Sequence, residues 1–366
     1  MFNPSRLTLA RQRRGFTKTR LAMEVDVAVR SITAYEAGMT VPKGETIQRL
    51  SKILAFPDSF FFADDIEAPN PEGVSFRSLK SMTAGKRDAA LGASALAIEL
   101  SSWIDKGFSL PDPNLPDLQD DEPEAAAEAV RADWGLGEKP VRNVVHLLEA
   151  HGVRVFSLAE ECLEVDAFSF WRNGIPYVFL NTKKSGERSR LDAAHELGHL
   201  VLHRHDLPRS RDIEREAQRF AGAFLMPRSS VLANVSGLVT VPKLIKLKHI
   251  WNVSVTALTY RLHELNVLTD WQYRTLFKEL STRGYRKSEP DPCQRETSQV
   301  YAKVFKLLRQ EGIDKRSIAK ALHVTPDEIN TFMFGLAFLS IEGGNQSEVV
   351  SSSAKPNLQL VPSTRG

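Results

Sequence analysis

Two histidines and one glutamate stand at a spacing that could bind and use a metal ion. His195 and His199 are four residues apart, so on a helix they lie one turn apart on one face, where both imidazoles can reach one Zn²⁺. Glu196 lies on the neighbouring face and is not a ligand. Its carboxylate can accept a proton from a water that such an ion activates and deliver it to a leaving amine. The pattern predicts peptide-bond hydrolysis with Glu196 as the catalytic residue.

A zinc peptidase also needs a third protein ligand, with the fourth position left open. The segment after the motif predicts a helix that ends at Met226-Pro227, and Glu214 near its start is the candidate third ligand. Glu216 is only two residues further on and should point elsewhere. Gln218 lies on the same face as Glu214, so we expect it to support a ligand from behind.

His203 continues the stripe of His195 and His199 on the predicted motif helix. It could line the cleft or stabilise an oxyanion. It could also be a histidine at a helix C-terminus, where the helix dipole favours a positive charge. The sequence leaves both interpretations open.

The motif helix is predicted over residues 188–204, with apolar residues at helical spacing toward a core. Asn173-Gly174, before this helix, is a strong hairpin signal. Three short β-like runs lie at residues 153–156, 167–171 and 176–180. The last two flank the hairpin signal, and the first precedes it. The elements that must position the histidines are therefore a small antiparallel sheet and the helix that follows it.

Together these residues resemble the ImmA/IrrE family of metallopeptidases over residues 140–265. The matching residues are Asn181, Arg188, Ala194 to His199, Glu214 to Ala217, Phe220, Ala221 and Leu225 to Pro227. The resemblance implies a zincin-like α+β domain in which His195, His199 and Glu214 bind Zn²⁺ and Glu196 is the catalytic carboxylate. It also implies cleavage of a helix-turn-helix repressor, which would release the genes that the repressor silences. Gln218 stands where the family often has asparagine.

The N-terminal segment is basic and predicts several short helices. Residues 1–55 contain ten Lys and Arg against four Asp and Glu, a balance that suits a nucleic-acid partner. Thr17 is placed to cap a helix that runs to about Val25. A short turn leads to a third helix over residues 29–37, which Gly38 stops, and a fourth helix covers residues 45–55.

This pattern resembles the Cro/C1-type (Xre-like) helix-turn-helix domain. The matching residues are Arg11, Arg14 to Thr17, Leu21, Ala22, Ile32, Tyr35 to Gly38, Pro42, Thr46, Leu50, Ser51 and Leu54. Two residues depart from the family pattern. Asp26 stands in the turn where glycine is usual, although Asp tolerates the positive φ of such a position. Lys18 stands where glutamine is frequent, and would still meet a phosphate.

The resemblance implies double-stranded operator DNA as a partner, with the third helix in the major groove. The residues expected at the DNA are Val29, Arg30 and Ala34 at the bases, and Lys18, Arg11 and Lys43 at phosphates. Arg30 is suited to paired hydrogen bonds with a guanine. A homodimer on two half-sites is expected. Because Val29 and Ala34 are poor readers of bases, a protein-interaction domain without DNA contacts is the alternative.

The whole chain is predicted to be mainly α-helical and multidomain. The expected parts are an all-α helix-turn-helix domain (1–65), a helical linker region with an acidic, Pro-rich stretch (66–135), the peptidase domain with a helical C-terminal region (136–285), a small helical unit (286–342) and a disordered tail (343–366). Within the small unit, a run from Arg316 to Ile329 hints at a second helix-turn-helix-like fold that could be a partner surface.

The composition limits where the protein works. There is no apolar stretch of about 18 residues, and the first twenty residues lack the apolar core of a secretion signal. Cys162 and Cys293 are far apart and form no metal spacing, which suits a reducing compartment. We therefore expect a cytoplasmic protein.

The predicted function is a DNA-binding transcriptional regulator whose zinc-dependent endopeptidase domain cleaves a helix-turn-helix repressor. One alternative is a non-catalytic regulator whose peptidase-like domain senses a ligand or a metal. Another is a toxin–antitoxin or prophage component whose body docks a partner protein. The first alternative shares the fold and the DNA partner with the leading prediction and differs from it at Glu196.

Overall fold

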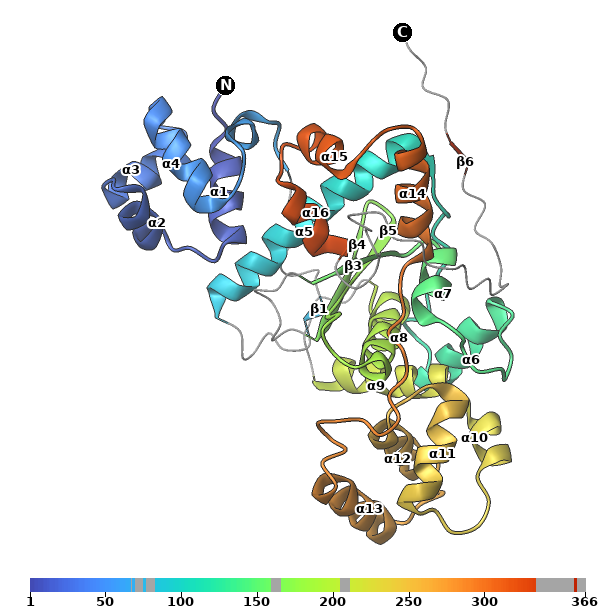
Figure 1. Cartoon of the computed structure of the whole chain (residues 1–366). Helices are drawn as coiled ribbons and strands as arrows, with labels where there is room; N and C mark the ends of the chain where they lie inside the picture. Colours follow the sequence, from blue (N-terminus) through green and yellow to red (C-terminus); the bar gives the residue numbers. More distant parts are fainter. Residues whose placement is uncertain are drawn as a thin grey trace. The chain divides into compact units, whose positions relative to one another are not determined.

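The computed structural model describes residues 1–66, 68–69, 75–76, 83–158, 166–204, 211–333 and 359–360 (Figure 1). The chain forms two compact units. The first contains Met1–Pro111, Phe156–Asp166 and Gln299–Gly366, and the second contains Asp112–Val155 and Ala167–Ser298. Helices dominate both units, which confirms a mainly α-helical chain.

The first unit combines the N-terminal helices with the last helices of the chain. Its elements are α1 (Pro4–Arg13), α2 (Lys18–Val25), α3 (Val29–Glu36), α4 (Gly44–Leu54), the 3₁₀ helix η1 (Asp58–Phe62), β1 (Ser75–Phe76), α5 (Ala84–Gly107), β2 (Phe108–Ser109), α14 (Gln299–Gln310), α15 (Lys315–Ala321), α16 (Pro326–Met333) and β6 (Gln359–Leu360). α1 packs against α3, α5 and η1, and α5 also packs against α16.

The turn between α2 and α3 forms as the sequence predicts. The Thr17 side chain caps α2 by accepting a hydrogen bond from the backbone N–H of Arg20. Asp26 ends α2 in the left-handed region at φ 57°, the strained position that the sequence assigned to it. Gly38 follows α3 at φ 69°. These local signals set the length and the direction of α3, the helix predicted to face DNA.

The second unit contains a sheet and most of the remaining helices. Its elements are α6 (Pro123–Asp133), α7 (Val144–Ala150), β3 (Arg154–Ser157, whose last two residues belong to the first unit), β4 (Ala167–Arg172), β5 (Ile175–Leu180), α8 (Gly186–Leu202), α9 (Arg211–Leu225), α10 (Arg228–Asn234), α11 (Val241–Trp251), α12 (Val255–Glu264) and α13 (Asp270–Thr282). α8 packs against α7, α9, β4 and β5 (Figure 1).

The expected antiparallel sheet is antiparallel only in part. β4 and β5 form the predicted hairpin, with Ala167 opposite Leu180 and Arg172 opposite Ile175, and Asn173 and Gly174 turn at φ 49° and 75°. β3 lies beside β5 and not beside β4, the next strand in the chain, and the sheet is mixed. The chain must cross over between β3 and β4, and a crossover permits a parallel pair where a tight turn does not. The sequence showed the hairpin but carried no signal for this crossover.

Gly198 allows α8 and α9 to approach closely. A Cβ at this position would lie 3.1 Å from a ring carbon of Phe220 and 3.2 Å from Cα of Ala217, both on α9. Such contacts are tighter than a packed interior tolerates without a shift of the neighbouring atoms. The glycine inside the His195–His199 motif therefore lets α9 approach α8 closely at this motif.

A buried ion pair holds the beginning of α8. The Glu187 carboxylate pairs with Nζ of Lys248 on α11 at 2.9 Å, and the two side chains are 0% and 1% exposed. The same carboxylate accepts a hydrogen bond from the backbone N–H of Cys293. Because breaking a buried pair leaves an unpaired charge inside the protein, this contact fixes the position of the helix start.

Some predictions fall outside the described residues. Cys162 is among them, as is the predicted disordered tail apart from residues 359–360. Cys293 is described, and burial raises the pKa of its thiol to about 11. Among the described helices, none is both long and apolar enough to cross a bilayer. The proposed boundaries at residues 65, 135, 285 and 342 stay predictions.

Candidate metal centre

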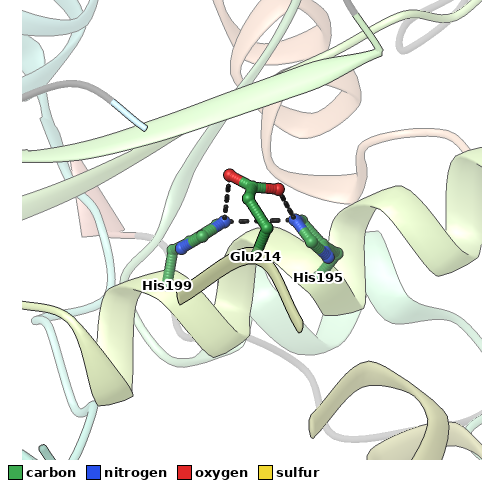
Figure 2. A group of neighbouring side chains, drawn as sticks. All are labelled: His195, His199 and Glu214. Carbon is green, nitrogen blue, oxygen red and sulfur yellow. Dashed lines mark hydrogen bonds and ion pairs between the residues drawn. The ribbon is translucent and has the colours of Figure 1, made fainter. Parts of the chain in front are cut away.

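His195 and His199 lie on the buried face of α8. Ser185 caps the helix by accepting a hydrogen bond from the backbone N–H of Arg188, so the helix begins slightly earlier than residue 188. The two histidines are 1% and 5% exposed. Their Nε2 atoms face each other at 3.1 Å, as the one-turn spacing requires. Figure 2 shows both rings on one side of the helix.

Glu214 on α9 completes a triangle with the two histidines (Figure 2). Its Oε2 lies 3.3 Å from Nε2 of His195, and its Oε1 lies 3.5 Å from Nε2 of His199. In a tetrahedral zinc site with bonds of about 2.1 Å, neighbouring ligand atoms lie roughly 3.4 Å apart. The two Nε2 atoms are near this separation, and each lies a similar distance from a different oxygen of Glu214. With one ligand atom taken from each residue, all three atoms lie within 4.8 Å of one another. The two histidines and Glu214 thus have the donor types of a three-ligand zinc site and lie close enough together to share one ion.

One buried polar atom of this cluster fits a cation. Oε2 of Glu214 is buried and accepts no hydrogen bond within the described residues, although it lies near His195. A buried acceptor without a donor is unfavourable. A divalent cation held by Glu214 and the two histidines would give this oxygen a partner.

His203 and Glu216 form a chain of hydrogen-bond contacts that leads to His199. Nδ1 of His199 lies 3.1 Å from Nδ1 of His203, and Nε2 of His203 lies 3.0 Å from Oε2 of Glu216. If Glu216 accepts the Nε2 proton of His203, Nδ1 of His203 accepts the Nδ1 proton of His199. The lone pair at Nε2 of His199 then points at the metal position, which is the tautomer that a metal requires.

His203 and Glu216 therefore have positions that sequence reasoning did not assign. Glu216 points away from the ligand triangle to His203, in agreement with the expectation that it points elsewhere. His203 is the C-terminal cap of α8 and also contacts a candidate ligand. The continued histidine stripe was the available signal, but its link to Glu216 depends on how α9 packs.

Glu196 is buried and held from the sheet. Its side chain is 1% exposed, and its Oε2 accepts a hydrogen bond of 2.7 Å from Oγ of Ser169 on β4. The sequence analysis did not identify Ser169. Its only signal was a hydroxyl between Phe168 and Phe170 in a strand whose first four residues are buried. The hydrogen bond fixes one carboxylate oxygen of Glu196.

Gln218 is the residue that the sequence predicts to support a ligand. It lies one turn after Glu214 on α9, but its Oε1 is buried and makes no hydrogen bond within the described residues. By contrast with His199, Nδ1 of His195 also has no hydrogen-bond partner there. Support of a ligand by Gln218 therefore stays a prediction.

The residues predicted to contact DNA differ in exposure. Val29 and Arg30 are exposed at the start of α3, Ala34 is half-buried, and Lys43 is exposed. Arg11 is only 12% exposed, because its Nε pairs with Oε1 of Glu36 at 2.5 Å. Nζ of Lys18 lies 3.2 Å from the other oxygen of Glu36, with its side chain 42% exposed.

Glu36 thus partly neutralises two of the predicted phosphate contacts. The Arg11 guanidinium also donates to the carbonyl of Phe16, so it is engaged within the domain. Arg30 and Lys43 are the predicted cations that stay exposed.

Comparison with known protein families agrees with this arrangement. Residues 148–263 match a peptidase family described as the IrrE N-terminal-like domain. Residues 7–61 match a helix-turn-helix family. A search among curated proteins gave no match. The first match contains the helices that carry His195, His199 and Glu214, and the second contains α3.

Proposed function

We propose that this chain, in which a helix-turn-helix domain precedes an IrrE N-terminal-like domain, is a transcriptional regulator with a zinc-dependent endopeptidase activity. The substrate that we propose is a helix-turn-helix repressor. The carrying observation is the cluster of His195, His199 and Glu214, which each offer one ligand atom within 4.8 Å of the others, beside the buried carboxylate of Glu196. A structural zinc site would use four protein ligands, whereas three leave a position open for chemistry.

Within this proposal each residue of the candidate site has a defined role. A bound Zn²⁺ polarises a carbonyl and lowers the pKa of a water toward neutrality. His203 and Glu216 keep the Nδ1 proton on His199, so its Nε2 stays available as a ligand. Glu196 is the base that takes the proton from the attacking water and the acid that gives it to the leaving amine. Ser169 holds one oxygen of that carboxylate by donating a hydrogen bond to it.

The helix-turn-helix domain would bring this chemistry to promoters. Arg30 at the exposed start of α3 is our candidate for reading a guanine, with Val29 and Ala34 beside it. Lys43, Lys18 and Arg11 are our candidates for phosphate contacts. Holding a peptidase on DNA where a repressor also binds raises the effective concentration of its substrate. A homodimer on two half-sites is part of the proposal.

The test uses the purified full chain with Zn²⁺ and the helix-turn-helix proteins encoded beside its gene. We expect one of these proteins to be cut at a defined bond, and the cut to disappear after zinc is removed and to return when zinc is restored. Electrophoresis and mass spectrometry of the fragments give the bond. Tight operator binding without any cleavage under several metals and pH values would refute the peptidase and leave a metal-sensing regulator.

A further inference from the structure

The last three helices of the first unit have the same order and the same turn conformations as its first three helices. α14, α15 and α16 follow one another as α1, α2 and α3 do, and α3 and α16 both contain eight residues. At a constant offset along the sequence, the left-handed residue Asp26 (φ 57°) corresponds to His323 (φ 56°). At the same offset, Gly15 (φ 64°) corresponds to Gly312 (φ 75°), so both turns of the motif recur.

The hydrogen bonds of the two segments also correspond. The backbone N–H of Val27 donates to the carbonyl of Ala22 at 2.9 Å, and that of Val324 donates to Ala319 at 2.9 Å. At the helix starts, Thr17 caps α2 and Asp314 caps α15, and each side chain accepts from the N–H three residues on.

The apolar contacts that hold the two turns agree as well. Leu21 corresponds to Ile318 and Ile32 corresponds to Ile329, and all four side chains are 0% exposed. Helix lengths, caps, turn conformations and core positions therefore all describe one motif. By its geometry, the segment over residues 299–333 is a helix-turn-helix.

The two copies differ in which face of the last helix is covered. In α3 only Ile32 is buried, whereas α16 also buries Glu328, Phe332 and Met333. A helix that reads DNA must be free to enter the major groove. The positions that correspond to Val29, Arg30 and Ala34 hold Pro326, Asp327 and Thr331. An exposed carboxylate at Asp327 would repel phosphates, so α16 is unsuited to DNA.

The covered face of α16 contacts the N-terminal domain. α16 packs against α5, and Oε2 of Glu328 pairs with Nε of Arg13 at the end of α1 at 3.1 Å. Oε1 of Glu328 pairs with Arg14 at 2.5 Å. The side chains of Arg13 and Glu328 are 1% and 3% exposed. Since a buried charge without its partner is strongly unfavourable, this contact is specific for that acid and those two bases.

We infer that residues 299–333 are a second helix-turn-helix unit that binds protein and not DNA, with the N-terminal helix-turn-helix domain of the same chain as its partner. Glu328 is the residue that selects this partner through Arg13 and Arg14. α16 contacts α1 and α5, so the start of α3 stays exposed and available to DNA. The second helix-turn-helix unit therefore holds the N-terminal domain in place.

Hydrogen exchange of the full chain tests the docking. Glu328→Gln removes the charge that holds Arg13 and Arg14, and we expect the amides of α1 to exchange at least about tenfold faster, with a lower midpoint of thermal unfolding. The matched control is Asp327→Asn, which removes an exposed acid from the neighbouring position and should change neither measurement. Unchanged exchange in α1 of Glu328→Gln would overturn the inference.

A milder variant covers the case in which Glu328→Gln does not fold. Glu328→Asp keeps the charge but shortens the side chain, so it should weaken the contacts with both Arg13 and Arg14. We expect a smaller acceleration of exchange, again in α1. If Glu328→Asp also leaves α1 unchanged, the ion pair does not dock the domain.

A binding assay with a short DNA duplex of mixed sequence tests whether residues 299–333 contribute to DNA binding. Replacing the exposed Arg316 and Lys320 of α15 by glutamine should leave the affinity of the full chain unchanged. The comparison is the same replacement of Arg30 and Lys43, which should weaken binding. Equal losses in the two variants would show that the second copy binds DNA and would refute its assignment as a protein-docking unit.

Discussion

The metal centre and the start of α3 are built in opposite ways. At the candidate metal centre the two histidines are buried, and several side chains have partners in the protein, such as His203 for His199 and Ser169 for Glu196. At the start of α3, Val29 and Arg30 are exposed, and Ala28 gives the helix no side-chain cap. Packing positions the first set of groups before any ligand binds. The second set is positioned by its backbone alone.

This difference teaches where substitutions should matter most. A group whose geometry is fixed by packing loses its function when one neighbour changes, because no water or flexible side chain can replace that neighbour. A group at an exposed helix start contributes one contact among several, so its loss weakens binding without abolishing it. The effects that we expect therefore fall from the metal centre to the DNA-facing surface.

The largest effect should come from Glu196→Gln. This substitution keeps the size of the side chain and the contact with Ser169 but removes the proton acceptor, so we expect cleavage to fall by about 10²–10⁴-fold. Zinc content should not change, because Glu196 is not a ligand. Single-turnover cleavage and metal analysis measure the two. Full cleavage by Glu196→Gln would remove this residue from the chemistry.

The next effect should come from His203→Ala. The substitution removes the contact between His203 and Nδ1 of His199, and we expect zinc affinity to fall about 10–100-fold. Glu216→Gln should change the affinity in the same direction and by less. Competition with a chelator measures it without any need for activity. His249→Ala removes an exposed histidine on α11 and is the control; equal affinities for all variants would make His203 a helix cap only.

A smaller effect is expected at the DNA-facing surface. Arg30→Ala should weaken operator binding by about 1–3 kcal/mol and relax the preference for one base pair. Titrations against the operator and against single-base variants of it distinguish this from a general loss of affinity. Zinc content should stay the same. If every sequence weakens equally, Arg30 contacts a phosphate and does not read a base.

The smallest effect should come from Lys43→Gln. Removing one exposed phosphate contact should reduce the salt dependence of log Kd by about one unit of slope, equally for all sequences. Titrations at several salt concentrations give the slope. A slope equal to that of the unmodified chain would place Lys43 away from the DNA.

Local signals in the sequence predicted much of the fold. The cap at Thr17, the left-handed position of Asp26 and the Asn173-Gly174 turn are decided by a few neighbouring residues, and the structure has all three where the sequence places them. The i and i+4 spacing of His195 and His199 likewise follows from helix geometry alone. Such features need no knowledge of distant parts of the chain.

The remaining parts of the site depend on contacts between distant segments. Ser169 reaches Glu196 only because β4 packs on α8, and Glu216 reaches His203 only because α9 does. The neighbour of β3 is set by a crossover and not by a turn signal. The sequence only hinted at the helix-turn-helix fold over residues 299–333. Which residues of α16 are buried depends on its packing against distant helices, and the sequence carries no signal for that packing.

Gly198 has a consequence for the residues that can stand inside the motif. The two histidines and Glu214 come from separate helices, and α8 and α9 approach closely at this glycine. An alanine here would require Phe220 and Ala217 on α9 to give way by a few tenths of an ångström. The absence of a side chain at one position of α8 thus determines how near Glu214 can come to the two histidines.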